Sequence, residues 1–287
     1  DIVEPGESVT NDAADITWTS INGADVGERD GSGTGPDDYV ALTGATALTI
    51  PVPTISKTLV STEVEADNNN RLDVTIGETA RFQVTVHLPE GRSRVLTLSD
   101  TLGVGLDFVR IEQIVPSGSM STNVGAGDFS DPGSFSVTKS TDGTTSPQLV
   151  TISLGDVDNT NETLAIDTLT IEYTVRVLNT PLNISNGQSA GTTFGNSAVV
   201  SWNLTGSGTQ STNVDTSETL EVVEPELTIS KSVDDSLPNL GQTIRYTLTL
   251  DHLPASDTDA YDVVLQDLLP GHLMLLPGSI SATNASI

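Results

Sequence analysis

Apolar side chains in this chain recur at every second position, and this pattern limits the fold more than any other feature. Phe82, Val84 and Val86 alternate with Gln83 and Thr85. Alternation of this kind points one set of side chains to each face of a β-strand, and Thr, Val and Ile favour strands. Clusters of Gly, Pro, Asn and Asp separate the runs and predict turns, and no amphipathic helix is evident. The sequence therefore predicts an all-β protein of the sandwich type. The same alternation also covers Leu96–Ser99 and Ile171–Val177.

The chain also repeats itself. The segment Gly77–Phe82 recurs as Gly241–Tyr246, and Ala14–Trp18 resembles Ala198–Trp202. Chain order then predicts three parts: residues 1–50 as the C-terminal part of one repeat, 51–223 as a complete repeat, and 224–287 as the N-terminal part of the next. Both ends are thus expected to lie inside a domain. The fold class expected is tandem Ig-like β-sandwich domains, one complete and two partial, in which each unit contacts mainly its neighbours. Further matches join Pro53–Lys57 to Glu226–Lys231, His87–Pro89 to His252–Pro254, and Leu98–Asp100 to Leu265–Asp267.

Composition excludes several kinds of function. The chain has 11 Lys plus Arg against 39 Asp plus Glu, a net charge of −28, so nucleic acid and anionic lipid are poor partners. There is no cysteine, which excludes disulfides and cysteine-ligated metals. No apolar run is long enough for a membrane span, and no signal peptide is recognisable, so no membrane insertion is expected of this segment. Acidic chains poor in aromatic residues are often disordered, but the strong patterning here favours a folded protein.

Three polar residues share the phase of the apolar core. Ile55, Lys57 and Leu59 fall on one face of a predicted strand, so Lys57 should point inward, where lysine is rare without a partner. The same test places Asp100 and Asn196 on the inward faces of their strands. The second copy agrees, because Lys231 and Asp267 also fall in phase with apolar neighbours.

These residues carry a resemblance to a known family. The chain resembles the isopeptide-forming domains of bacterial pilins and collagen-adhesin-type surface proteins, and the related tandem repeat of giant bacterial surface proteins. The resemblance covers the central repeat and both partial ones, and its most specific part is the NSAVVSW segment that begins at Asn196. It implies that Lys57 bonds covalently to Asn196 with Asp100 as the catalytic acid. It also implies that Asp12, Lys231 and Asp267 belong to equivalent partial sites.

The chemistry suits those residue types. Burial lowers the pKa of a lysine and raises that of a carboxyl group, so Lys57 can act as a neutral amine while Asp100 donates a proton to the Asn196 amide. The amine attacks the amide carbon and ammonia leaves. Such a step is autocatalytic and happens once, so the protein is not expected to be an enzyme, and it requires no cofactor. The alternative is a buried Lys57–Asp100 ion pair with Asn196 as a hydrogen-bonded neighbour.

The first partial repeat differs at one position. Aligning Trp18 with Trp202 places Asp12 opposite Asn196, and both tryptophans are expected in the core. Asn11 takes that place instead if a bulge shifts the register. A bond swapped between two chains is a lesser alternative for the partial sites.

Two acidic segments are candidate calcium sites. Carboxylate and amide oxygens at alternate positions suit calcium, which takes six to eight oxygen ligands. Neither segment has the spacing of an EF-hand loop, and a solvated acidic loop explains them equally well. The residues are Asp156, Asp158, Asn161 and Glu162 in the first segment and Asp30, Asp37 and Asp38 in the second.

The function expected from sequence is mechanical. The chain is predicted to be a stalk or fibre segment of a large extracellular or cell-surface protein, with neighbouring repeats as its partners. One alternative is a calcium-dependent binding module for glycan or protein. Another is a self-assembling subunit of an extracellular filament or surface layer, whose partners would be copies of itself. No hydrolase or nucleotide-binding motif occurs in the sequence.

Overall fold

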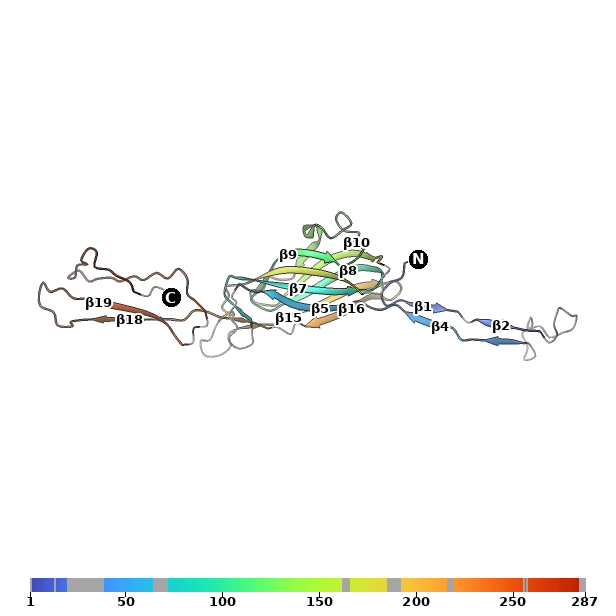
Figure 1. Ribbon diagram of the computed structural model, residues 1–287, viewed down its shortest axis with the longest axis horizontal. Coiled ribbons are helices and arrows are strands. Elements are labelled where there is room, and N and C mark those ends of the chain that lie inside the picture. Colours follow the sequence, from blue (N-terminus) through green and yellow to red (C-terminus); the bar gives the residue numbers. More distant parts are fainter. Residues whose placement is uncertain are drawn as a thin grey trace.

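The computed structural model confirms the all-β fold (Figure 1). It describes residues 2–12, 14–19, 39–63, 72–161, 166–184, 192–215, 219–254, 256 and 258–283. Within these ranges the only helical element is a short 3₁₀ turn, η1 (Pro132–Ser134), and no helix there is long and apolar enough to cross a membrane.

An Ig-like sandwich of two antiparallel sheets forms the middle of the molecule. The first sheet has the order β5 (Thr54–Ser61), β7 (Thr79–Leu88), β13 (Asp167–Val177) and β9 (Leu106–Pro116). The second has the order β10 (Met120–Thr122), β12 (Gln148–Asn159), β8 (Gly91–Leu102), β15 (Asn196–Leu204) and β16 (Gly208–Asp215), with β11 (Ser136–Lys139) also paired to β12.

The core lies between these sheets and is made by the alternating residues. Phe82, Val84 and Val86 of β7 are at most 2% exposed, and Leu98 of β8 is fully buried. Each such side chain contributes roughly 1.5–3 kcal/mol by leaving water. Because a slip of one residue would turn every apolar side chain outward, the pattern also specifies the strand register.

A small third sheet closes one end of the sandwich. It joins β14 (Thr193–Phe194), β17 (Leu220–Val222) and β6 (Leu72–Val74), and β17 pairs with β6 in parallel. Val222 and Phe194 are buried here. The chain leaves the sandwich at this end.

A two-stranded hairpin extends from the opposite end (Figure 1). In it β1 (Ser8–Asn11) pairs with β4 (Thr46–Thr49), and β2 (Asp15–Thr17) pairs with β3 (Val40–Leu42) in the same continuous register. Trp18 stacks on Tyr39 with ring centroids 5.5 Å apart but is 47% exposed. The prediction that Trp18 is a core residue was therefore wrong, because no second sheet covers this hairpin in the described residues, whereas Trp202 is 2% exposed.

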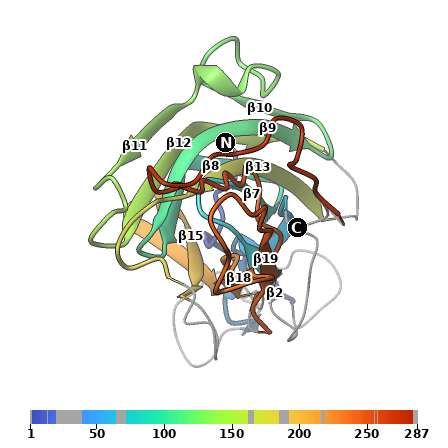
Figure 2. The same ribbon diagram turned by 90° about the vertical axis from the view of Figure 1, so that its left-hand side faces the viewer.

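The C-terminal hairpin repeats the local geometry of the sandwich. β18 (Leu227–Val233) pairs with β19 (Tyr246–His252), and Lys231 lies opposite Leu248. In the sandwich Lys57 lies opposite Val84, two residues after Phe82, just as Leu248 lies two residues after Tyr246. Viewed from this end, the hairpin lies in front of the sandwich (Figure 2).

Candidate crosslinking site

Strands from both sheets bring the three predicted residues together. Lys57 comes from β5 in the first sheet, whereas Asp100 of β8 and Asn196 of β15 come from the second. Their exposed fractions are 5%, 1% and 6%. The Lys57 ammonium donates to Asp100 Oδ2 in an ion pair whose two side chains are 0% and 2% exposed. Asn196 lies one strand away, because β15 pairs directly with β8.

Tyr173 completes the site, and the sequence interpretation missed it. Its hydroxyl donates to Asp100 Oδ2 and lies 3.4 Å from Asn196 Nδ2, which donates to it. Tyr173 therefore connects the acid to the amide whose nitrogen would leave. The available signal was weak: a tyrosine between Ile171 and Val175 looks like core, although a buried phenol needs a hydrogen-bond partner.

Burial controls the electrostatics of the site. Desolvation lowers the pKa of Lys57 to about 8, against the opposing effect of Asp100. Desolvation also raises the pKa of Asp100, against the opposing effects of Lys57 and Tyr173. Both shifts favour a neutral amine beside a neutral carboxyl group over a buried ion pair. The pKa of Tyr173 is raised well above its ordinary value, chiefly by burial, so the phenol keeps its proton.

The second oxygen of Asp100 is also informative. Asp100 Oδ1 is buried and accepts no hydrogen bond from the described residues. A buried carboxylate oxygen without a donor is costly, and protonation of the carboxyl group reduces that cost. This is a further reason for Asp100 to hold a proton.

The C-terminal hairpin and the segment that follows it carry the same pair in a more open setting, with Lys231 on β18 and Asp267 after β19. Lys231 Nζ lies 2.6 and 2.8 Å from the two carboxylate oxygens of Asp267, and the two side chains are 39% and 29% exposed. Lys231 lies 4.7 Å from the ring centroid of Tyr246, as Lys57 lies 5.2 Å from that of Phe82. The local arrangement is thus repeated without the enclosure.

The remaining predicted partner positions lie on the N-terminal hairpin. Asn11 ends β1 opposite Thr46, and Asp12 follows it as an exposed residue. The structure does not bring either residue to Lys57 or to Lys231.

The first acidic segment is occupied by contacts to β8. Asp158 accepts two hydrogen bonds from Arg92, at 2.6 and 2.7 Å, and Asp156 Oδ1 accepts from the Val95 backbone N–H at 2.9 Å. Val95 has a φ of 48°, a strained conformation for a β-branched residue, so Asp156 supports a local irregularity of the strand. Asn161 donates to Asp167 at 2.8 Å.

These contacts do not form a metal site in the part of the chain that the structure describes. No group of three or more His, Asp or Glu side chains converges there. Glu162, Asp30, Asp37 and Asp38 lie outside the described residues. Calcium binding therefore stays a prediction.

Comparison with known proteins gives structural similarities only. No family model matches the chain, and no curated protein matches it in sequence. Among solved structures, the C-terminal fragment of the major pilin GBS80 of Streptococcus agalactiae is 11% identical with a TM-score of 0.37, covering 62% of this chain and 58% of that chain. Domains D2 and D3 of the major pilin SpaD of Corynebacterium diphtheriae are 14% identical with a TM-score of 0.34, covering 66% and 58%. The pilin BcpA of Bacillus cereus is 9% identical with a TM-score of 0.37, covering 78% and 69%.

The chain therefore spans less than two thirds of the length of the first two of these structures. TM-scores this low support no conclusion about function, so the function is inferred from the chain's own residues. The fold and the site together define an all-β sandwich protein with a buried lysine, acid and amide between its two sheets.

Proposed function

We propose that this chain is a segment of an extracellular structural stalk or fibre, stabilised by a self-formed isopeptide bond between Lys57 and Asn196. The observation that carries the proposal is the buried group of Lys57, Asp100 and Asn196, which draws on both sheets of one sandwich. Neighbouring repeats of the same chain are the partners of such a segment.

The reaction follows from the protonation states that burial favours. Lys57 loses its proton to Asp100, which gives a neutral amine and a neutral carboxyl group. The amine nitrogen attacks the Asn196 side-chain carbon, and Asp100 stabilises the oxygen that becomes negative. The C–N bond to the amide nitrogen then breaks. The amine loses one proton, the leaving nitrogen gains one, and the products are an amide and one molecule of ammonia.

Tyr173 has a defined part in this scheme. The leaving nitrogen must be protonated before it departs, and the Tyr173 hydroxyl is 3.4 Å from it. Because Tyr173 also contacts Asp100, it can pass a proton to the nitrogen while it takes one from the carboxyl group. Tyr173 is accordingly a catalytic residue of the proposed step.

The bond has a mechanical consequence. Lys57 lies on β5, where the chain enters the sandwich from the N-terminal hairpin, and Asn196 begins β15, near where the chain leaves. A covalent link between them carries tension past the strands from β6 to β14 without loading their hydrogen bonds. It also converts the buried lysine amine into a neutral amide, which has no charged form to bury. A chain without cysteine thus gains the equivalent of a disulfide.

Intact mass spectrometry of the whole chain tests the proposal. The folded protein should weigh one ammonia less than its sequence, and peptide mapping should join the peptides of Lys57 and Asn196. Lys57→Ala should restore the full mass, whereas the matched variant Lys231→Ala should keep the deficit. A full mass for the correctly folded parent chain would overturn the crosslink.

A further inference from the structure

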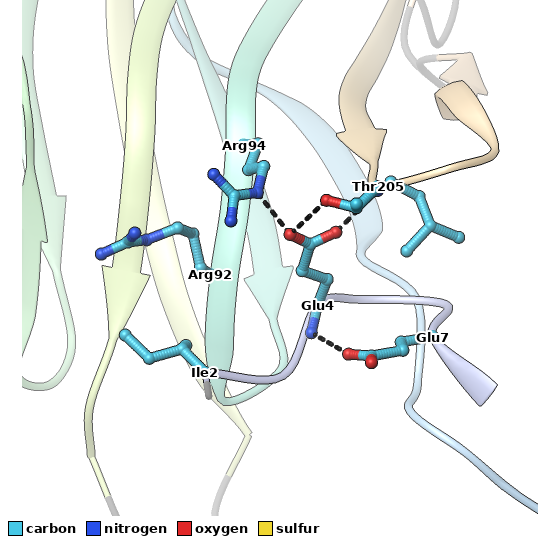
Figure 3. Close-up of a pocket in the computed structure, with 7 residues that line it drawn as sticks. Ile2, Glu4, Glu7, Arg92, Arg94 and Thr205 are labelled. Atoms are coloured by element: carbon cyan, nitrogen blue, oxygen red, sulfur yellow. Dashed lines mark hydrogen bonds and ion pairs between the residues drawn. The ribbon is translucent and has the colours of Figure 1, made fainter. Parts of the chain in front are cut away.

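A short segment before the N-terminal hairpin is seated in the end of the sandwich. The Glu4 segment (residues 2–7) lies against Arg92 and Arg94 of β8 and Thr205, which follows β15 (Figure 3). Together with Trp202 of β15, which contacts Pro5, these residues form a socket. The open recess that remains beside it has a volume of about 530 Å³. Glu4 itself is only 5% exposed, although it is an acid at the surface of a strongly acidic protein.

Glu4 is held by three donors. Arg94 Nε donates to Glu4 Oε1, the Thr205 hydroxyl donates to the same oxygen at 2.8 Å, and the Thr205 backbone N–H donates to Oε2 at 2.7 Å (Figure 3). Burial alone would raise the pKa of Glu4, but these hydrogen bonds outweigh it and lower the pKa. A carboxylate with this many donors is held as a charged group.

The backbone of the segment is held as well. Arg92 N–H donates to Val3 O at 2.8 Å, and the Trp202 indole donates to Pro5 O at 3.1 Å. The fit is close at Gly91, where φ is 112° and an added Cβ would lie 2.2 Å from Val3 O. Only glycine is compatible with this approach of the two backbones.

Hydrogen bonds also join the Glu4 segment to the base of the N-terminal hairpin. Glu7 N–H donates to Glu4 O at 3.0 Å, and the Glu4 N–H donates to the Glu7 carboxylate at 2.9 Å, which makes a tight turn. Gly6 and Glu7 then pair with Ile50 on the returning strand, at 3.1 and 2.8 Å. Both strands of the hairpin are therefore anchored at their base.

We propose that the Glu4 segment is an inter-repeat latch, by which the unit that contains residues 2–50 is locked rigidly to the socket of the central sandwich. The occupant of the socket is the neighbouring repeat of this same chain. The inference rests on the proposed tandem organisation, but it does not depend on the isopeptide bond, since no residue of the latch belongs to that site.

In the described residues, the next joint along the chain has no counterpart of the Glu4–Arg94 ion pair. Val95 and Asp262 both have positive φ, 48° and 53°, and each lies five residues before the aspartate of its Lys–Asp pair, so they mark equivalent positions. When Val95 is aligned with Asp262, Tyr261 takes the position of Arg94 and Asp259 takes the position of Arg92. Neither residue can form an ion pair with a glutamate such as Glu4. Successive joints therefore differ, with a latched joint before the central sandwich and an unlatched one after it.

Pulsed electron paramagnetic resonance on the full chain tests the latch. The chain has no native cysteine, so labels can be attached at introduced cysteines alone. One labelled pair, Thr10→Cys with Ser211→Cys, spans the latched joint. A second pair, Ser117→Cys with Ser232→Cys, spans the other joint. All four positions are exposed.

The expected result is a narrow distance distribution across the first joint and a broad one across the second. Glu4→Gln and Arg94→Gln should each remove the narrow peak. The double variant should give a distance distribution no broader than that of either single variant, because the two residues form one ion pair. Glu90→Gln, an exposed change of equal charge, should leave the peak intact. A narrow peak that survives both latch variants, or equal widths at the two joints, would overturn the proposal.

Folding and crosslinking are followed on the same samples. Near-ultraviolet circular dichroism checks that the sandwich is intact in each variant. Intact mass reports the Lys57–Asn196 bond separately, so a failed crosslink and a failed latch give different results.

Discussion

The sandwich and the C-terminal hairpin contain the same lysine–aspartate pair in two environments. Lys57 and Lys231 have the same cross-strand register and an aromatic ring at the same position, and each contacts an aspartate. The lysine side chain is 0% exposed in the first case and 39% exposed in the second. The ion pair therefore forms without a closed sandwich, whereas two closed sheets are needed to remove it from water. The enclosed pair has the shifted pKa values that a reactive amine and acid require.

The largest difference between the two regions should appear when each aspartate is replaced. Asp100→Asn removes the acid of the proposed reaction, so the bond does not form, and the chain-entropy model puts that loss at about 5 kcal/mol. The variant also leaves Lys57 buried without its partner, which costs about 3–5 kcal/mol in a buried pair. Asp267→Asn breaks a partly exposed pair, and such pairs are worth about 0–1 kcal/mol. Urea unfolding followed by circular dichroism measures both, and intact mass should show the ammonia deficit lost only in Asp100→Asn. Equal losses of stability in the two variants would show that enclosure does not distinguish the pairs.

Removal of the amide should separate the bond from the ion pair. Asn196→Ala leaves Lys57 and Asp100 in place but prevents the crosslink. For a closed loop of more than 100 residues, the chain-entropy model predicts a loss of about 5 kcal/mol. The melting temperature should then fall by about 10–20 °C, as measured by calorimetry. Asn213→Ala, on the exposed face of the neighbouring strand, is the control and should change it little.

Much of the site could be predicted because successive side chains of a strand point to opposite faces, so the sequence position alone decides which face a residue is on. Lys57, Asp100 and Asn196 each fall in phase with apolar neighbours, and the structure places all three inside. Tyr173 follows the same rule, but a phase shared with apolar residues does not tell which polar group it meets across the sheets. Its contacts depend on how β13 packs over β8, and alternation carries no information about that packing.

The acidic segment and Trp18 illustrate the other limit. Asp156 and Asp158 are spaced like cation ligands, yet their donors are Val95 and Arg92 on a neighbouring strand. Sequence spacing describes one strand at a time, so it does not reveal a donor supplied by another. Trp18 has the correct phase for a core residue but lies on a hairpin that no second sheet covers in the described chain. The alternation of apolar residues predicts which way a side chain points, but the side chain is buried only where a second sheet covers that face.

Replacement of Tyr173 should slow the crosslink without unfolding the sandwich. Tyr173→Phe keeps the ring beside Lys57 and removes only the hydroxyl that bridges Asp100 and Asn196. General acid catalysis contributes about 10²–10⁴-fold, so bond formation should slow by at least about 10²-fold. The rate is measured by intact mass during refolding of chain that has never folded, recovered from inclusion bodies in denaturant and confirmed to have its full mass before refolding starts. Tyr246→Phe in the C-terminal hairpin is the matched control and should have no effect on the rate.

The pH profile of bond formation reports the reactive pair. The amine and acid together hold one proton, so the parent rate should fall as the pH rises above the Lys57 pKa of about 8, where the pair loses that proton. The pKa of Tyr173 is raised, so its proton is still present in this range and Tyr173→Phe should slow the reaction by the same factor at each pH. A parent rate that stays constant well above pH 8 would contradict the roles of Lys57 and Asp100, and a slowing by Tyr173→Phe that depends on pH would contradict a donor that keeps its proton.

The smallest effect should be the response of the N-terminal joint to acid. The pKa of Glu4 is lowered in the folded chain, so its contribution is complete above the ordinary glutamate value of about 4.3 and is lost as pH falls through the lowered value. Arg92, Arg94, Glu7 and Thr205 are the groups that face it across the recess. Protonated Glu4 no longer attracts the guanidinium groups of Arg92 and Arg94. The narrow distance peak across the latched joint should therefore broaden as the pH falls below about 4.3 and through the lowered pKa of Glu4, whereas the distance distribution across the unlatched joint should stay broad throughout. The distance distribution of Glu4→Gln should be broad at every pH. The pKa of Asp158 is also lowered, by Arg92, but Asp158 is present in both proteins, so the difference between the parent and Glu4→Gln isolates the effect of Glu4. A peak that stays narrow at pH 3 in the folded parent would show that the backbone contacts of Val3 and Pro5, and not the carboxylate, hold the joint.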